Sequence, residues 1–197
     1  MLASSLVSRN ATVATIIAVS WLVFIAAQLR TWKPDSIDAD AVVADRRSHT
    51  VFALATVCGM AVAWVLAYVD VAVLPVQPAV VAIGMVMMWA ALALRIWARR
   101  TLGEFFDPKV TIRSTHVLVD RGPYRLLRHP IYLSYLLCYS GLGVALGTIL
   151  TVAACSIPTI AALAYRVHVE EAELAGHFGD AWSAYANGRA RVIPWLW

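Results

Sequence analysis

Long apolar runs alternate with short polar stretches along this chain. Three runs approach the ~20 residues that an α-helix needs to cross a hydrocarbon core of ~30 Å, and they are residues 11–29, 51–69 and 78–98. A fourth apolar region, residues 131–165, contains Gly141, Gly143 and Gly147. At ~1.5 Å of rise per residue, each half of that region is just long enough to cross. The pattern therefore predicts an all-α integral membrane protein with about five transmembrane helices, the last two forming a tight hairpin that the glycines interrupt.

Small residues and an amphipathic stretch complete this pattern. Gly143 and Gly147 have the spacing of small residues that lets membrane helices approach closely. Residues 168–188, HVEEAELAGHFGDAWSAYANG, have the periodicity of an amphipathic helix, which Gly188 would end. Its apolar stripe would consist of Val169, Ala172, Leu174, Phe178, Ala181, Trp182 and Tyr185. We expect this C-terminal helix to lie along the membrane interface and to cover the bundle.

Composition agrees with a membrane protein, because hydrophobic residues make up 61% and charged residues 14% of the chain, with a mean hydropathy of +0.71. Soluble domains average roughly 45–50% apolar and ~25% charged residues. The 197 residues suit one structural unit with two parts, a three-helix part (1–98) and a part that holds the hairpin (99–197). The net charge of +4 does not indicate a nucleic-acid partner, since the basic residues flank apolar runs.

The basic residues also give an orientation, because cytoplasmic loops are enriched in Lys and Arg. Every Lys and Arg except Arg9 lies on one side of the predicted helices. We therefore expect the N-terminus outside and the C-terminus in the cytoplasm, with the first apolar run retained as a membrane helix rather than cleaved as a signal. Residues 99–130 and 166–197 would leave the membrane close together, because the hairpin joins them. Any chemistry should be assembled there.

Several common sites have no counterpart in the sequence. It contains no GxGxxG after a strand, no GxxxxGK[ST] and no GxSxG, which excludes the usual dinucleotide, P-loop and serine-hydrolase motifs. Only two pairs, His168 with Glu171 and Glu173 with His177, have the spacing of ligands on one helix face. A metal centre in a helical bundle needs more such pairs, so we predict no metal site.

Polar residues near the membrane boundary are the candidates for chemistry, namely Lys109, His116, Tyr124, Arg128, His129, Tyr132, Arg166 and Glu170. Arg166 and Glu170 lie one helical turn apart, so they form either a functional ion pair or an ordinary surface pair. Pro130 disfavours a helical conformation at His129 and suits the first turn of the next helix. The free N–H groups of that turn attract an anion such as a carboxylate. Arg125 is adequately explained as an anchor for lipid phosphates.

Three separated motifs carry a resemblance to a known family. HVLVDRGPYRLLRHPIY, an apolar hairpin and RVHVEEAELAGHFGDAWSAYANGRARVIP follow one another within residues 94–194. This order resembles the isoprenylcysteine carboxyl methyltransferases and their prokaryotic relatives. The superfamily also includes phospholipid N-methyltransferases and the C-terminal part of sterol reductases. The resemblance implies that residues 99–197 bind S-adenosyl-L-methionine with cytoplasmic loops and hairpin ends, without a Rossmann domain.

The resemblance also implies roles for single residues. Those that would bind S-adenosyl-L-methionine are Lys109, His116, Val117, Leu118, Val119, Tyr124, His129, Pro130, Ile131, Tyr132 and Glu170. Arg166 matches the family's arginine that faces the substrate carboxylate and is the expected catalytic residue. Whether Arg128 and Lys109 are site residues or anchors stays open.

We therefore expect an S-adenosyl-L-methionine-dependent carboxyl O-methyltransferase at the cytoplasmic membrane face, acting on a lipophilic, isoprenylcysteine-like carboxylate. A carboxylate is already ionised at pH 7, so it needs alignment with the methyl donor rather than a general base. Two alternatives stay open, a phospholipid or amine N-methyltransferase and a non-catalytic membrane assembly or small-molecule-binding protein. An amine acceptor would need a base, and Arg166 beside it would not help. The expected partners are this substrate and membrane lipids, with no nucleic acid and no metal.

Overall fold

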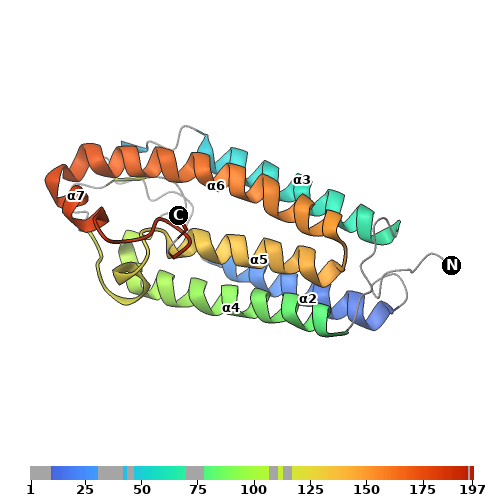
Figure 1. The fold of residues 1–197 in the computed structure, drawn as a ribbon. Coiled ribbons are helices and arrows are strands. Elements are labelled where there is room, and N and C mark those ends of the chain that lie inside the picture. The colour runs from blue at the N-terminus through green and yellow to red at the C-terminus, as the bar shows by residue number, and fades with distance from the viewer. Residues whose placement is uncertain are drawn as a thin grey trace.

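The computed structural model describes residues 10–30, 42–43, 47–69, 78–106, 111–112, 117–194 and 196–197. Its long helices run side by side in an elongated bundle (Figure 1). The helices are α2 (Ala11–Leu29), α3 (Ser48–Tyr68), α4 (Pro78–Leu102), α5 (Pro130–Leu146), α6 (Ile149–Phe178) and α7 (Asp180–Ala186). The remaining elements are the 3-10 turns η1 (Gly103–Phe105) and η2 (Gly122–Arg125) and the antiparallel pair β1 (Val42–Val43) and β2 (Thr111–Ile112). The predicted helical architecture is confirmed.

Four of these helices, α2, α3, α4 and α6, are long and apolar enough to cross a membrane. α2 has the bounds that the apolar pattern predicts, whereas α3 already begins at Ser48 and α4 continues to Leu102. α5 is apolar but shorter, with 17 residues. The chain is therefore a multi-pass membrane protein with four candidate spans, and a fifth crossing by α5 stays a prediction.

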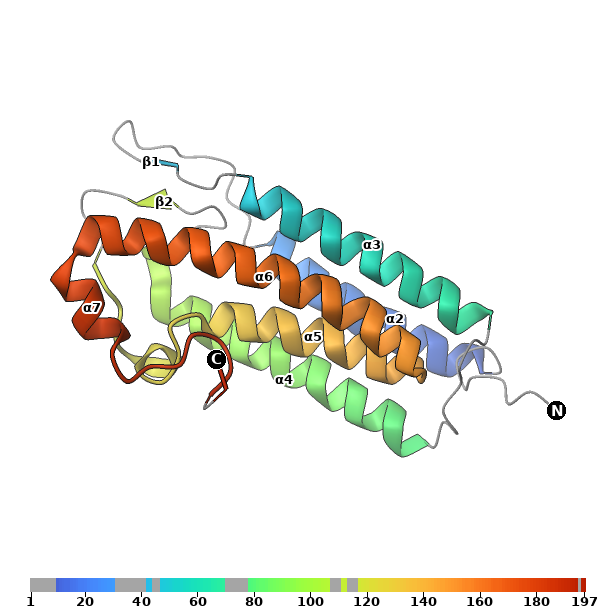
Figure 2. The same cartoon turned by 45° about the horizontal axis from the view of Figure 1, so that its top comes forward.

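Glycines set the closest contacts between helices. Gly84 of α4 lies against α5, where a Cβ would come within 2.5 Å of the backbone oxygen of Gly141. Gly59 of α3 lies against α6, where a Cβ would come within 2.4 Å of the backbone oxygen of Ala154. α4 consequently packs on α5, and α3 packs on α6, as two views of the bundle show (Figures 1 and 2). These contacts hold the N-terminal helices against the hairpin.

The hairpin between α5 and α6 turns at one glycine. Gly147 has a φ of 83°, and the Thr148 side chain caps α6 by accepting a hydrogen bond from the Thr151 amide at 2.9 Å. Gly141 and Gly143 lie inside α5, so the prediction that they interrupt the helix is wrong. Their close contacts with neighbouring helices offset the low helix propensity of glycine. The predicted close approach holds at Gly143, where a Cβ would lie 2.7 Å from the Thr151 oxygen of α6.

The predicted C-terminal amphipathic helix over residues 168–188 is not a separate element. α6 continues from its apolar part to Phe178 without a break, and Gly179, with a φ of 53°, turns the chain into the short α7. The physical reason is that residues 159–175 contain neither glycine nor proline that could end α6. The stretch with amphipathic periodicity is therefore split between the end of α6 and α7.

Only part of the predicted apolar stripe faces protein. Val169 and Trp182 are buried, whereas Ala172 and Ala181 are exposed. After α7 the chain folds back toward the beginning of α5 (Figure 1), and Gly188 has a φ of 75° in this turn. The end of α6, α7 and the C-terminal segment thus surround the N-terminus of α5.

Candidate active site at the start of α5

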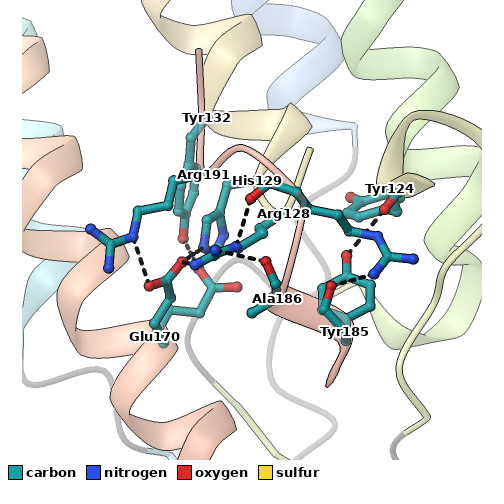
Figure 3. A network of polar contacts seen from close by, with 10 residues as sticks. Tyr124, Arg128, His129, Tyr132, Glu170, Tyr185, Ala186 and Arg191 are labelled. Carbon is teal, nitrogen blue, oxygen red and sulfur yellow. Dashed lines mark hydrogen bonds and ion pairs between the residues drawn. The ribbon is translucent and has the colours of Figure 1, made fainter. Parts of the chain in front are cut away.

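Tyr132 joins the two charged residues that the sequence places one turn apart on α6. Tyr132 lies in the first turn of α5, and its hydroxyl donates a hydrogen bond to Glu170 Oε2 (Figure 3). Arg166 Nε donates to the same hydroxyl at 2.8 Å, and Arg166 Nη1 donates to Ser48 Oγ at 3.1 Å. Arg166 and Tyr132 are only 5% and 7% exposed. A buried cation and a carboxylate are therefore linked through one phenol.

His129 lies beside this group. Its ring stacks on that of Tyr132, with centroids 5.2 Å apart and planes inclined by 12°. The backbone of His129 has a φ of −127°, outside the helical range, because Pro130 follows it. His129 Nδ1 lies 3.7 Å from Glu170 Oε2, and Nε2 lies 3.3 Å from Glu171 Oε1. The buried imidazole thus sits between two carboxylates.

Glu171 is the centre of a second polar group, which the sequence pattern does not indicate. Besides His129, its carboxylate accepts hydrogen bonds from Arg128 Nη1 at 3.1 Å and from Arg191 Nε at 3.0 Å. The Glu171 side chain is only 13% exposed. Sequence spacing connects Glu171 with His168, which is exposed, whereas its real partners come from distant segments. In the described part of the chain, no group of three or more His, Cys, Asp or Glu side chains could hold a metal ion.

The C-terminal segment pairs with the residues that precede α5. The Arg128 amide donates to the Ala190 oxygen at 2.9 Å, and the His129 amide donates to the Arg191 oxygen at 2.9 Å. Leu127 and Ala190 form an isolated parallel bridge. These backbone bonds fix the position of His129 from outside its own helix.

Arg128 strengthens the same connection with its side chain. Its Nη2 donates to the Ala186 oxygen at 2.8 Å and its Nε donates to the Arg189 oxygen at 3.1 Å, in addition to the contact with Glu171 (Figure 3). The Arg128 side chain is 18% exposed. Arg128, which the sequence leaves open between lipid anchor and site residue, therefore bonds to protein groups and holds the C-terminal segment beside His129.

Tyr124 borders the cluster from the η2 turn and is 6% exposed. Burial raises the pKa of Tyr124 well above its usual value, and the negative charge of Glu170 raises this pKa further. Tyr185 of α7 donates to the Tyr124 backbone oxygen at 3.4 Å, and burial raises the pKa of Tyr185 to about 12. Both phenols are therefore protonated near neutral pH and act as uncharged hydroxyl groups.

The other residues predicted to bind the cofactor are only partly described. Lys109 and His116 lie outside the described residues. Val117 is 59% exposed, whereas Leu118 is half-buried and Val119 packs against the edge of the core. A role for these positions in cofactor binding stays a prediction.

Comparison with known proteins supports the resemblance to one family. The family model described as the isoprenylcysteine carboxyl methyltransferase (ICMT) family matches residues 82–176. This segment, just under half of the chain, matches the ICMT family. The matched segment contains Tyr132 and Arg166, together with Glu170 and Glu171, and the resemblance inferred from the motifs is confirmed.

Plant members of the ICMT family are similar to this chain. Protein-S-isoprenylcysteine O-methyltransferase A of Arabidopsis thaliana is 30% identical over 115 residues, which cover 57% of this chain and 58% of that protein. A probable protein-S-isoprenylcysteine O-methyltransferase of Oryza sativa subsp. indica is 29% identical over 116 residues, which cover 58% of this chain and 61% of that protein. The chain thus aligns with about three fifths of the length of these relatives.

Proposed function

We propose that this chain is an S-adenosyl-L-methionine-dependent methyltransferase that modifies the carboxylate of a lipophilic, isoprenylcysteine-like molecule at the cytoplasmic membrane face. One observation carries the proposal. Tyr132, Arg166 and Glu170 form a hydrogen-bonded group beside the N-terminus of α5, within the segment that matches the ICMT family. The names of the plant relatives supply the substrate class.

The N-terminus of α5 fits the carboxylate of S-adenosyl-L-methionine. Pro130 has no N–H, and the amides of Tyr132 and Leu133 bond to the His129 oxygen at 3.0 and 3.2 Å. The Ile131 amide has no carbonyl partner among the described residues. It is therefore available to an anion at the positive end of the helix dipole.

Glu170 fits the ammonium group of the same molecule. One carboxylate oxygen, Oε2, accepts from Tyr132, while Oε1 accepts no hydrogen bond from the part of the chain that the structure describes. The Glu170 side chain is 28% exposed, so it is accessible to a ligand from one side. A carboxylate with one fixed and one available oxygen can bind an ammonium group without moving.

S-adenosyl-L-methionine, when bound, supplies the reactive methyl group. The protein residues would bind and orient the reactants. Glu170 and the Ile131 amide would hold the zwitterionic end of the methyl donor, and Arg166 would attract the acceptor carboxylate by its positive charge. Because that carboxylate is ionised at neutral pH, no group has to remove a proton. Catalysis would then rest on alignment in a site with little water.

The charges at the site favour a carboxylate over an amine acceptor. Arg166 is buried beside Tyr132, and Arg128 and Arg191 lie around Glu171. An amine acceptor must lose a proton before it can attack. The nearby cations would repel its protonated, positively charged form. An anionic acceptor is attracted by the same cations. The proposed cytoplasmic location rests on the distribution of Lys and Arg.

Transfer of a radiolabelled methyl group tests the proposal. The purified protein in phosphatidylcholine nanodiscs is incubated with methyl-tritiated S-adenosyl-L-methionine and N-acetyl-S-farnesyl-L-cysteine. We expect product label that mild base releases as methanol, which is diagnostic of an ester. Label that resists base, or no transfer to this acceptor, would contradict carboxyl methylation.

Variants connect the activity with the site. Arg166→Ala and Glu170→Ala should each lower the transfer rate by about 100-fold or more, since both remove charged groups that position a reactant. Arg125→Ala is the matched control, because Arg125 is exposed in η2 and should leave the rate unchanged. Equal rates in all three variants would contradict the site assignment.

A further inference from the structure

A cavity of about 470 Å³ lies between α6, α7 and the C-terminal segment. This volume is within the range of ~300–1,000 Å³ that is typical of small-molecule sites. The cavity is lined by Ala164, Ala172 and Ala175 from α6, by Trp182 from α7 and by Trp197 from the C-terminal segment. The short alanine side chains leave the space that the two tryptophans border.

The cavity is separate from the candidate active site. Two positions along an α-helix correspond to a rotation of about 200°, so His168, which lines the cavity, lies on the face of α6 opposite to Arg166. Neither Arg166 nor Glu170 lines the cavity. Glu171 borders both regions, because it lines the cavity and also pairs with His129. The cavity therefore lies beside the site without being part of it.

The position of the cavity along α6 corresponds to the edge of a membrane. About 20 helical residues cross a hydrocarbon core of ~30 Å, and such a crossing from Ile149, the first residue of α6, ends near His168. Ala164 then lies just inside the hydrocarbon, whereas Ala175 lies outside it. Tryptophan is enriched at this level of a membrane, which agrees with the two tryptophans that border the cavity. Phospholipid head groups occupy the same level.

Three side chains offer hydrogen-bond donors at the cavity. Arg191 donates from Nε to Glu171, and its two terminal nitrogens have no partner in the described part of the chain. These nitrogens point away from the polar cluster (Figure 3). Trp182 is only 7% exposed, and its indole N–H has no hydrogen-bond partner among the described residues. The imidazole of His168 is exposed. A buried indole N–H usually has a partner, so a ligand with several acceptor atoms fits this cavity.

The charges favour an anionic ligand. Glu171 is the only acidic residue in the lining, and both of its oxygens already accept hydrogen bonds, from Arg128, His129 and Arg191. The two arginines outweigh this single negative charge. Tryptophan rings also attract a quaternary ammonium group, but the arginines would repel it. A phosphate instead matches the terminal nitrogens of Arg191, which can donate two parallel hydrogen bonds.

We infer that this cavity binds the head group of an anionic phospholipid, and that Arg191 and Trp182 hold its phosphate. The acyl chains extend past Ala164 into the hydrocarbon. The bound lipid also stabilises the C-terminal segment, because the Arg191 oxygen accepts the hydrogen bond from the His129 amide. This inference does not rest on the proposed methyl transfer.

Native mass spectrometry of the whole protein in a neutral detergent tests the inference. The protein is titrated with dioleoylphosphatidylglycerol and, separately, with dioleoylphosphatidylcholine. The wild-type protein should bind one phosphatidylglycerol at least ~10-fold more tightly than phosphatidylcholine, the ratio expected from hydrogen bonds to a charged group. Arg191→Gln should lose this preference. Arg125→Gln removes the same charge from an exposed position in η2, outside the cavity, and should keep it.

A second variant tests the cavity without changing its charges. Ala172 is exposed and lines the cavity, so Ala172→Trp should fill the space, leave the pair of Arg191 with Glu171 in place and remove the preference. Ala181→Trp, at an exposed position of α7 outside the lining, is the matched control and should keep it. All variants should bind phosphatidylcholine as the wild type does, which shows that they are folded.

Competition with glycerol 3-phosphate distinguishes a lipid from a soluble phosphate. This compound has the phosphate but no acyl chains, so at millimolar concentration it should not displace phosphatidylglycerol. Displacement would assign the cavity to a soluble phosphate and overturn the inference. Equal affinity of the wild type for the two lipids, or a preference that survives in Arg191→Gln or in Ala172→Trp, would overturn it as well.

Discussion

Arg166 on α6 donates a hydrogen bond from Nε to the hydroxyl of Tyr132 on α5 at 2.8 Å. The same hydroxyl donates to Glu170. The phenol of Tyr132 therefore connects α5 and α6 at the end of the hairpin that lies away from its turn. Removing the hydroxyl would break the link between the two charged residues, although Arg166 would keep its hydrogen bond to Ser48. The geometry of the candidate site consequently depends on the packing of α5 against α6.

Tyr132→Phe tests this dependence. The substitution leaves Arg166 Nε and Glu170 Oε2 without their common partner, and an unsatisfied buried polar group costs about 1–3 kcal/mol. We expect methyl transfer to fall by at least ~10-fold and S-adenosylhomocysteine to bind more weakly. Tyr68→Phe is the control, because Tyr68 is 83% exposed at the end of α3. Unchanged transfer by Tyr132→Phe in a radiolabel assay would show that the bridge is dispensable.

Arg166→Lys separates charge from geometry. The lysine keeps a positive charge, but one ammonium group cannot reproduce the separate bonds from Nε to Tyr132 and from Nη1 to Ser48. We expect a fall in kcat of about 100-fold, close to that of Arg166→Ala, with S-adenosylhomocysteine binding largely preserved. The measurement is steady-state kinetics with varied acceptor. A lysine variant with a wild-type kcat would mean that charge alone suffices.

Glu171→Gln should loosen the C-terminal segment. A neutral amide retains the shape of the side chain but loses the charge that attracts Arg128 and Arg191. We expect faster proteolysis of residues 187–197 and weaker S-adenosylhomocysteine binding, since this segment fixes the His129 backbone. Glu173→Gln, two positions further on α6 and half-buried, is the control. The same proteolysis rate in both variants would exclude a clamping role for Glu171.

Gly84→Ala should destabilise the bundle. A Cβ at this position would lie 2.5 Å from backbone atoms of α5, which cannot rotate away, and such overpacking typically costs about 1–3 kcal/mol. Gly176→Ala on α6 is the opposite case, because nothing lies within 4 Å of the added Cβ. There the higher helix propensity of alanine should slightly stabilise the protein. Thermal unfolding in detergent compares the two variants, and equal midpoints would contradict the close contact of α4 with α5.

The apolar runs were sufficient to predict the long helices, because a membrane requires a minimum length of uninterrupted apolar helix. The Arg166–Glu170 spacing and the His129-Pro130 motif also pointed to residues that the structure brings together. The role of Glu171 could not be predicted, since its partners Arg128 and Arg191 are distant in sequence and meet only after the chain folds back.

Two further misses have different causes. Gly141 and Gly143 looked like helix breakers, but close helix contacts compensate for them and only Gly147 turns the chain. Arg95 did carry a signal, because it is the only charged residue in the apolar run 78–98. Read simply as a basic residue near a helix end, it contributes to the orientation. Its burial and its unbonded guanidinium nitrogens become apparent only when the neighbouring helices are in place.

Calorimetric titration with S-adenosylhomocysteine tests the central claim most directly, because it requires no knowledge of the acceptor. The wild-type protein should bind one equivalent of S-adenosylhomocysteine. Glu170→Ala should lose most of that affinity, because Glu170 supplies the only carboxylate in the group of Tyr132, Arg166 and Glu170, and one of its oxygens is available for the ammonium of the ligand. Arg125→Ala should bind as wild type. The absence of binding to the wild-type protein at millimolar ligand, or equal binding by wild type and Glu170→Ala, would contradict a methyl-donor site at the start of α5.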